Sequence, residues 1–319
     1  MKIYKPDKIS IVIVNYFNKV LTIKCIESIF NLKTAPYSVV VVDNGSDEYH
    51  EIFFEWGKLS KKYRRNQPYL CNNDSIFPDS GDMLIVSGSN DGFSAGNNIG
   101  IKAILTRKQK CQGIWLLNND TELDGYALEN ICKRMNSGPH VDIVGSTLVN
   151  DKNTIQCASG GMVSKITGRT FDIFRGRKVH NFSEKQVKHV EKTLDYVNGA
   201  SIFIALDVIE KIGLLEENYF LYYEDVDFCV RAKKCNFSLG WAHNSIVYHK
   251  IGASAKKSSS IMYYYSTRNR LIFMKKYLNF GKFLSITTLP LFLLSNIIQG
   301  NFKNIKILLN VYAELWGKK

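Results

Sequence analysis

Amide and carboxylate side chains follow an apolar run in the middle of this sequence. The run 113–117 ends in Asn118, Asn119 and Asp120. One carboxylate with neighbouring amide oxygens suits a hard cation such as Mg²⁺, which prefers oxygen ligands and shares phosphate oxygens with a substrate. Asn and Asp are also common in ordinary turns after strands. The pattern therefore leaves two interpretations open, a metal site and a turn.

Three acids form a second group that could do chemistry. Glu224, Asp225 and Asp227 follow the aromatic-rich run 220–223, at the predicted start of a helix that reaches about residue 234. Acids in that position could simply complement the helix dipole. Crowded carboxylates beside aromatic rings, however, oppose each other's ionisation, and a general base or a metal shell uses carboxylates held in that way. We favour a functional role for this group.

A histidine and a glycine-rich segment complete the candidates. His249 closes the predicted strand 246–249, where it could be structural or, as a neutral imidazole, a metal ligand. Segment 88–100 contains four glycines and three asparagines. A glycine-rich turn that opens a helix lets backbone N–H groups approach an anion. Its spacing is not the G-x-G-x-x-G of dinucleotide-binding folds.

The elements that would position these side chains are those of an α/β fold. Buried strands of a parallel sheet are continuous apolar runs, such as 9–14, 39–42 and 83–86. Apolar residues at helical spacing over 19–31 connect the first two runs, which predicts a right-handed βαβ unit. We predict a mostly parallel sheet flanked by helices, with polar residues at the carboxyl ends of its strands facing a ligand. Further strands are expected at 114–120, 141–144, 196–206 and 246–249, and further helices at 51–59, 97–108, 123–135, 207–212 and 224–234.

Two stretches show no regular pattern. Residues 58–82 include the Lys/Arg run 61–65, which we expect in a solvated loop because exposed Lys and Arg are the norm. Residues 150–195 are polar and basic, and we expect an irregular excursion there.

Composition limits the partners and the compartment. The chain has 319 residues, of which 45% are hydrophobic, and a net charge of +13. This balance favours anionic partners, which include nucleotide phosphates, nucleic acid and an acidic membrane surface. Because no nucleic-acid recognition motif is present, we expect no nucleic-acid partner. Seven cysteines without a CxxC pair, and an N-terminus without an apolar signal core, indicate a cytoplasmic protein with reduced thiols.

A series of short motifs runs through the chain in a recognisable order. They are 12–16 (VIVNY), 41–46 (VVDNGS), 90–98 (NDGFSAGNN), 116–120 (LLNND), 198–200 (NGA), 223–227 (YEDVD) and 249–254 (HKIGAS). Their order resembles the family 2 glycosyltransferases of the GT-A fold, in the branch that includes bacterial rhamnosyltransferases and related O-antigen and capsule enzymes. The resemblance covers about residues 9–275.

The resemblance implies an inverting transfer of a sugar from a nucleoside-diphosphate sugar to an acceptor hydroxyl, assisted by Mg²⁺ or Mn²⁺. The segment Asn118-Asn119-Asp120 occupies the position of the family's D-x-D motif. Asn118 replaces the first Asp and is assigned to the nucleotide side. Asp120 is then the carboxylate that would hold the metal, with His249 as its partner.

The resemblance also implies roles on either side of the metal. Asp225 matches the general base, and Glu224 is a neighbour that would position the substrate. Asp43 matches the acid that accepts a hydrogen bond from a pyrimidine base. Asn15 matches the nucleotide contact on the first strand, and Asn90 matches the polar residue that lines the nucleotide site.

The chain is divided accordingly. Residues 1–255 would form the GT-A catalytic domain, with a nucleotide-binding half at 1–112 and a metal and acceptor half at 113–255. Residues 256–319 would form a C-terminal helical extension.

The expected donor is dTDP-rhamnose. The expected acceptor is a saccharide or an undecaprenyl-linked saccharide of surface polysaccharide synthesis. The alternative donors are UDP-galactose, UDP-N-acetylglucosamine and a galactofuranose nucleotide. A different alternative is a sugar-nucleotide-binding protein without turnover, against which the presence of Asp120 and Asp225 argues.

The segment 283–298 is strongly apolar but spans only sixteen residues, too short for a confident transmembrane helix. One interpretation is a peripheral element that docks on the inner face of the cytoplasmic membrane. The other is a helix pair in a core or a homodimer interface. The flanking basic residues that favour the first are Lys275, Lys276, Lys282, Lys303 and Lys306.

Overall fold

The first half of the chain alternates strands and helices, as its apolar runs predict. The computed structural model describes residues 2–150, 153–179, 181–250 and 259–316. After a 3-10 turn, η1 (Pro6–Lys8), the elements are β1 (Ile9–Asn15), α1 (Lys19–Phe30), β2 (Ser38–Asp43), α2 (Tyr49–Lys62), β3 (Tyr69–Asn72), β4 (Met83–Val86), α3 (Phe93–Leu105) and β5 (Gly113–Asn118). Strands β1 and β2 are buried along their whole length, as expected for central strands covered on both faces.

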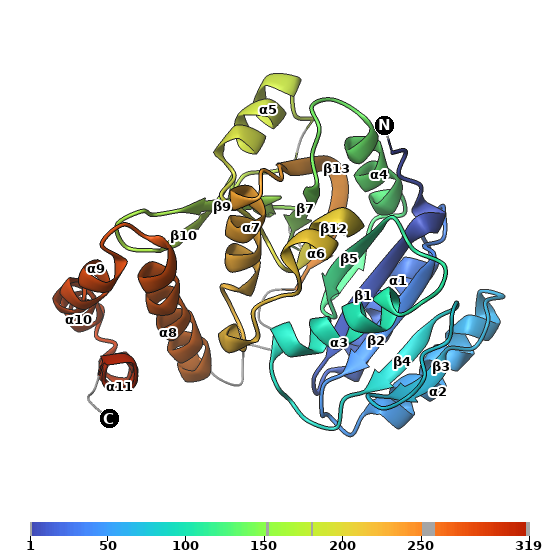
Figure 1. Ribbon diagram of the computed structural model, residues 1–319, viewed down its shortest axis with the longest axis horizontal. Coiled ribbons are helices and arrows are strands. Elements are labelled where there is room, and N and C mark those ends of the chain that lie inside the picture. The colour runs from blue at the N-terminus through green and yellow to red at the C-terminus, as the bar shows by residue number, and fades with distance from the viewer. Residues whose placement is uncertain (1, 151–152, 180, 251–258, 317–319) are drawn as a thin grey trace.

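The second half continues the same sheet. Its elements are β6 (Thr121–Leu123), α4 (Ala127–Asn136), β7 (Ile143–Val149), β8 (Ile155–Ala158), β12 (Ser201–Ala205), α6 (Leu206–Ile212), η2 (Glu217–Tyr219), α7 (Glu224–Lys234) and β13 (Leu239–His249). The 10-stranded sheet has the order β3-β4-β2-β1-β5-β12-β7-β13-β6, with β8 paired to β7. The predicted α/β class, a mostly parallel sheet flanked by helices, is confirmed (Figure 1).

Strand register brings the predicted polar strand ends to one edge of the sheet. Asn15 on β1 pairs with Asp43 on β2, and Val14 pairs with Asn118 on β5. Strand β12 is antiparallel to both β5 and β7, and β13 is parallel to β7, so β13 runs in the same direction as β1. His249, at the end of β13, therefore lies at the same carboxyl edge.

The stretch 150–195 is more regular than its sequence predicts. It holds β8, most of a 3-stranded antiparallel sheet and α5 (Glu184–Thr193). A capping box formed by Ser183 and Gln186 begins α5. The prediction of an irregular excursion is wrong because strands of two to four residues are too short to show a period. The strands of the small sheet are β9 (Gly160–Val163), β10 (Thr170–Asp172) and β11 (Tyr196–Val197). For the same reason β3 could not be predicted within the expected loop 58–82.

Some predicted bounds shift. The expected strand 196–206 divides into β11 and β12, and the helix expected at 97–108 begins earlier, at Phe93. The apolar segment 283–298 is two helices instead of one element. They separate at residue 288, just before Pro290, which occupies the first turn of the second helix, where proline is tolerated.

The C-terminal helices are α8 (Ser259–Tyr277), α9 (Gly281–Thr287), α10 (Leu289–Ile298) and α11 (Phe302–Trp316). Helix α8 belongs to two cores. Phe273 packs in the main core, while Leu271 and Met274 pack in a second core with α11. Figure 1 shows α8 to α11 at the opposite side of the molecule from β1 to β4. The predicted boundary between residues 255 and 256 lies outside the described residues.

No helix within the described ranges has the length and apolar character needed to cross a membrane.

Candidate active site

Asn15 and Asp43 form a buried pair at the carboxyl edge. The Asn15 amide donates to Asp43 Oδ1 at 2.8 Å and to Ser46 Oγ at 2.9 Å, and its oxygen accepts from Thr22 Oγ1 at 2.7 Å. Asn15 and Asp43 are both 0% exposed, and the Asn15 amide fixes the orientation of the Asp43 carboxylate. The other oxygen, Asp43 Oδ2, has no hydrogen-bond partner in the described part of the chain.

Burial also changes the acidity of Asp43. Loss of water raises the pKa of this carboxyl group above its ordinary value, although the hydrogen bonds from Ser46 and Asn15 act in the opposite direction. A buried oxygen without a donor costs free energy. An N–H group of a ligand would remove that cost.

Asn90 is linked to this pair by Asn44, the residue that follows Asp43. Asn44 Nδ2 donates to Asn90 Oδ1 at 3.0 Å, and the Gly92 N–H donates to the same oxygen at 3.1 Å. Gly92 has a φ of +99°, and a Cβ there would lie 2.4 Å from the Phe220 carbonyl oxygen. The glycine-rich segment is therefore in backbone contact with the chain that leads to Glu224, and the Phe93 N–H donates to Phe220 O at 2.6 Å.

Asp120 and His249 come together, as the sequence predicts. The His249 Nε2 atom is 3.2 Å from Asp120 Oδ1, and the two side chains are 17% and 9% exposed. The backbone supports the pair, because the Lys250 N–H donates to Asp120 O at 3.2 Å. Asn118 lies one residue before the turn, and its carbonyl accepts the Thr121 hydroxyl at 2.7 Å.

Gln156 on β8 fixes which nitrogen of His249 carries the proton. The Gln156 amide nitrogen donates to the His249 carbonyl, so its oxygen faces His249 Nδ1 at 2.9 Å. That oxygen can only accept, and Nδ1 must therefore carry hydrogen. In the neutral ring, the lone pair of Nε2 then points at Asp120 Oδ1, which no described donor reaches with a hydrogen bond.

Two electron-pair donors this close together in a buried place fit a cation bound beside them as neighbouring ligands. A hydrogen-bond acceptor on the other ring nitrogen, here the Gln156 oxygen, is also typical of metal-binding histidines. Among the described residues, no three His, Cys, Asp or Glu side chains gather as a metal cluster. Asp120 and His249 could thus hold a divalent cation only together with ligands from water or a substrate.

Glu224 and Asp225 begin α7, which reaches this edge through Gly199, because the Asn118 N–H donates to the carbonyl of the next residue, Ala200, at 3.1 Å. Asp225 accepts from the Gly199 N–H and from the Val226 N–H, both at 2.8 Å. Glu224 is 5% exposed, and its Oε2 atom has no partner among the described groups. Burial raises the pKa of Asp225 to about 6 and raises that of Glu224 well above its ordinary value, with the Asp225 charge adding to the second effect.

Tyr222 connects the acids to the metal-binding candidates. Burial raises the pKa of its hydroxyl, and the negative charges of Glu224 and Asp120 raise it further. Both carboxylates therefore act on the same phenol. The negative charge of Asp225 acts on other groups: together with that of Asp172, it raises the pKa values of Cys157 and Tyr196. The two acids of α7 thus face different surroundings.

Asp227 points elsewhere, as the helical period predicts. It is 0% exposed and accepts from Arg231 Nε at 2.7 Å, from Lys276 Nζ at 2.9 Å and from the Tyr277 hydroxyl at 2.6 Å. Burial would raise the pKa of Asp227, but these donors together lower it below its ordinary value. Asp227 joins α7 to α8 and does not face Asp120.

Sequence reasoning misses several residues of this site. Asn119 donates to Thr22 Oγ1 at 3.0 Å and so ties the turn after β5 to α1. Gln156 lies in the stretch expected to be irregular, and Asn269 contacts the chain before Glu224 from α8. Only the LLNND motif could have singled out Asn119. Nothing near Gln156 or Asn269 in the sequence indicates its partner.

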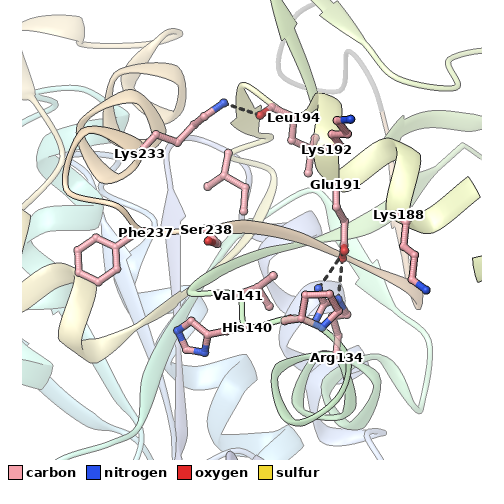
Figure 2. A pocket seen from close by; sticks show the side chains of 12 residues that line it. Arg134, His140, Val141, Lys188, Glu191, Lys192, Leu194, Lys233, Phe237 and Ser238 are labelled. Carbon is pink, nitrogen blue, oxygen red and sulfur yellow. Dashed lines mark hydrogen bonds and ion pairs between the residues drawn. The ribbon is translucent and has the colours of Figure 1, made fainter. Parts of the chain in front are cut away.

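The cavity in Figure 2 lies at the other edge of the sheet. It has a volume of about 430 Å³ and is lined by residues before β7 and at the start of β13. Arg134 and Glu191 form a two-contact ion pair at 2.6 and 2.9 Å across it, and Glu191 also accepts the Trp241 N–H at 2.9 Å. Because these buried charges satisfy each other, the cavity offers no unpaired group comparable to those at the carboxyl edge.

A solved structure shares the fold of this chain. The mannosyltransferase PcManGT from Pyrobaculum calidifontis, solved with GDP-Man and Mn²⁺, matches 99% of this chain and 79% of its own, with a TM-score of 0.54 and 11% identity. At this identity the match shows the fold alone. Residues 1–349 of S. aureus TarS match 97% of this chain and 72% of theirs at 12% identity, but their TM-score of 0.47 is too low to add to the argument.

A relative in sequence points the same way. The low-salt glycan biosynthesis hexosyltransferase Agl10 of Haloferax volcanii is 26% identical to this chain over 277 residues, which are 83% of this chain and 75% of Agl10. No family model matches the sequence. Together the two similarities support a glycosyltransferase. Membership of family 2 and of its rhamnosyltransferase branch stays a prediction.

The ion pairs of Asp227 predict a loss of stability in Asp227→Asn. Removing the charge should lower the free energy of unfolding by about 1.5–3 kcal/mol, the usual value for hydrogen bonds to a charged group. Because the folded-state pKa of Asp227 is depressed, this contribution is present above the ordinary Asp pKa of about 3.9 and is lost as pH falls below it. Urea unfolding at neutral pH and at acid pH measures both.

Glu184→Gln is the matched control. Glu184 also lies in the first turn of a helix and pairs with a lysine four residues on, but it is 90% exposed. Its replacement should change stability by less than about 0.5 kcal/mol. An equal effect of the two substitutions would contradict a structural role for Asp227.

Proposed function

We propose that this protein transfers a sugar from a nucleoside-diphosphate sugar to a hydroxyl group of an acceptor, with inversion at the sugar carbon. The observation that carries the proposal is the meeting of two groups at the carboxyl edge. One is the Asp120–His249 pair, held by Gln156, and the other is the acid pair Glu224–Asp225. The charges of Asp120 and Glu224 both raise the pKa of the Tyr222 hydroxyl.

Asp225 is the proposed general base. Its pKa of about 6 leaves it mostly ionised at neutral pH, yet basic enough to take the proton of an attacking hydroxyl. The two backbone N–H groups that it accepts hold its carboxylate in place. Glu224, whose raised pKa favours the protonated form, can donate a hydrogen bond and position the acceptor.

Asp120 and His249 are the proposed protein ligands of Mg²⁺ or Mn²⁺. Such an ion neutralises the charge that grows on the diphosphate as the sugar–phosphate bond breaks. PcManGT was solved with Mn²⁺, which supports a divalent metal in this fold. Asn118 replaces a carboxylate by an amide, so the protein supplies one carboxylate at this motif.

Asp43 is the proposed contact of the nucleotide base. Its unpartnered Oδ2 atom can accept the ring N–H of a pyrimidine, while Asn15 holds the other oxygen. Asn90 and Asn118 complete the nucleotide side. We favour dTDP-rhamnose as donor and a surface saccharide, free or lipid-linked, as acceptor; a UDP-sugar is the second candidate. A binding protein without turnover is disfavoured because the general-base candidate Asp225 and the metal-ligand candidate Asp120 are both present.

A donor screen tests this function. Release of nucleotide from dTDP-rhamnose, UDP-galactose, UDP-N-acetylglucosamine and GDP-mannose is measured with acceptor, with Mn²⁺ and with EDTA. We expect turnover with a pyrimidine donor, its loss with EDTA, and the same loss in Asp120→Ala. Turnover that survives EDTA unchanged would rule out the metal assignment, and a preference for GDP-mannose would rule out the pyrimidine assignment.

The assignment of the base is tested by isosteric replacement. Asp225→Asn should lower the rate of transfer by about 10²–10⁴, the usual contribution of a positioned base, while calorimetry shows unchanged nucleotide affinity. In the unsubstituted enzyme kcat should fall as pH decreases below about 6, because burial raises the pKa of Asp225 to that value. The folded Asp227→Asn variant is the control. If it loses transfer while Asp225→Asn keeps it, the base has been placed on the wrong carboxylate.

We propose peripheral membrane contact, on the inner face of the cytoplasmic membrane, through α9 and α10. Exposed apolar side chains recur along them at helical spacing: Leu291 (61%), Leu294 (54%) and Ile298 (76%), with Phe283 (67%) nearby. No Asp or Glu occurs between residues 227 and 314, whereas Lys and Arg recur there. An apolar helix face with basic surroundings binds anionic lipid.

Vesicle flotation tests this contact. The protein should bind phosphatidylcholine vesicles that contain phosphatidylglycerol, bind pure phosphatidylcholine more weakly, and lose binding in Leu294→Glu/Ile298→Glu. Ile76→Glu, which changes an equally apolar side chain that is 98% exposed, should bind like the unsubstituted protein. If the double variant instead converts a dimer to a monomer and vesicles never bind, the face is a homodimer interface.

A further inference from the structure

The acids that begin α7 are presented by an unusual stretch of backbone. Tyr222 has a φ of 71° and Tyr223 a φ of 72°, directly before Glu224. Two bulky residues in succession in the left-handed region are uncommon, and each is strained there. Tyr223 also occupies the N-cap position without a side-chain cap. Something outside the turn must hold this conformation.

Asn269 on α8 is that anchor. Its Nδ2 atom donates to the carbonyl oxygens of Tyr219 at 3.2 Å, Leu221 at 2.8 Å and Tyr222 at 2.9 Å. Asn269 is 0% exposed, so water does not replace these bonds. The amide orientation is unambiguous, because an oxygen in the same place would face three other oxygens. Its own oxygen accepts from Arg268 Nη1 at 3.1 Å.

Other contacts from α8 reach the same turn but bind its flanks. The rings of Phe220 and Tyr265 stack at 4.7 Å, and Arg268 Nη1 donates to Asn218 O at 3.1 Å. On the other side, Lys276 and Tyr277 bind Asp227. Figure 1 shows α8 alongside α7. Among these contacts, those of Asn269 reach the backbone of the left-handed pair itself, at the Tyr222 carbonyl, and the Leu221 carbonyl just before it.

We propose that Asn269 is a positioning residue for the transfer reaction, through which the C-terminal helices set the geometry of Glu224 and Asp225. This inference rests on the proposed function of those two acids. Asn269 contacts neither carboxylate. It acts by holding the backbone of residues 219–223 in the conformation in which Asp225 accepts the Gly199 N–H and the Glu224 side chain is buried. Loss of its NH₂ group removes the shared donor of these three carbonyl oxygens, and the turn relaxes.

The test compares two buried asparagines on the C-terminal helices. Asn269→Asp keeps the shape of the side chain and removes the amide donor. Asn296→Asp makes the same change on α10, where the Asn296 amide donates to the Tyr263 hydroxyl and to Phe292 O and does not reach the turn. Asn269→Ser, which keeps one donor on a shorter side chain, serves if Asn269→Asp does not fold.

We expect Asn269→Asp to lower kcat by about 10²-fold, since a misplacement of about 1 Å can cost that much, with the KM for the donor changed much less, because Asp43 is held by Asn15 and not by the turn. Asn269→Ser should retain part of kcat. Amide hydrogen exchange of residues 219–226 should accelerate in Asn269→Asp and not in Asn296→Asp. Asn296→Asp should lower the melting temperature and keep kcat.

The proposal is overturned if the two asparagine variants lose kcat equally, or if exchange of residues 219–226 is unchanged in Asn269→Asp. An unsubstituted protein that transfers no sugar from any donor would contradict the proposed function instead. In that case the exchange measurement still decides whether Asn269 anchors the turn.

Discussion

Carboxyl oxygens buried without a hydrogen-bond donor are the constraint on which this site depends. Asp43 Oδ2, Asp120 Oδ1 and Glu224 Oε2 all lack such a donor among the described residues. Leaving a charged or polar atom in that state costs free energy that the rest of the fold must offset. The apolar strands β1, β2 and β5, buried along nearly their whole length, supply that stabilisation. A nucleotide, a cation and an acceptor hydroxyl are the partners that such oxygens lack.

The strands and the strand-end residues could be predicted because their signal is local. A run such as Val39–Val42 predicts a buried strand, and Asp43 follows it directly. One stretch of sequence therefore predicts both the strand and the site residue. The short strands β9 to β11 could not be predicted, because two to four residues do not establish a period. The roles of Gln156 and Asn269 could not be predicted because their partners lie far along the chain. His249 is 93 residues from Gln156, and Tyr222 and Tyr219 are 47 and 50 residues from Asn269.

The C-terminal helices pack against the α/β part of the chain and share its core through α8. Phe273 of α8 lies in the main core, while its neighbours Leu271 and Met274 lie in the second core with α11. A helix shared in this way transmits the position of one core to the other, because close-packed interiors do not deform continuously. The side of the molecule with the exposed apolar face of α10 is therefore connected through α8 to the turn before Glu224.

The first turn of α7 shows how one helix serves two purposes. Asp225 and Asp227 are separated by about 200° around the axis, so one faces Gly199 and the other faces Lys276 and Arg231. Burial acts on both, yet the pKa of Asp225 is raised and that of Asp227 is lowered. The difference lies in the donors: backbone N–H groups hold Asp225 without a neighbouring cation, whereas two cations and a phenol hold Asp227. Asp227, whose pKa is lowered, stays ionised and stabilises the contact with α8. Asp225, whose pKa of about 6 lies close to neutral pH, can take up a proton.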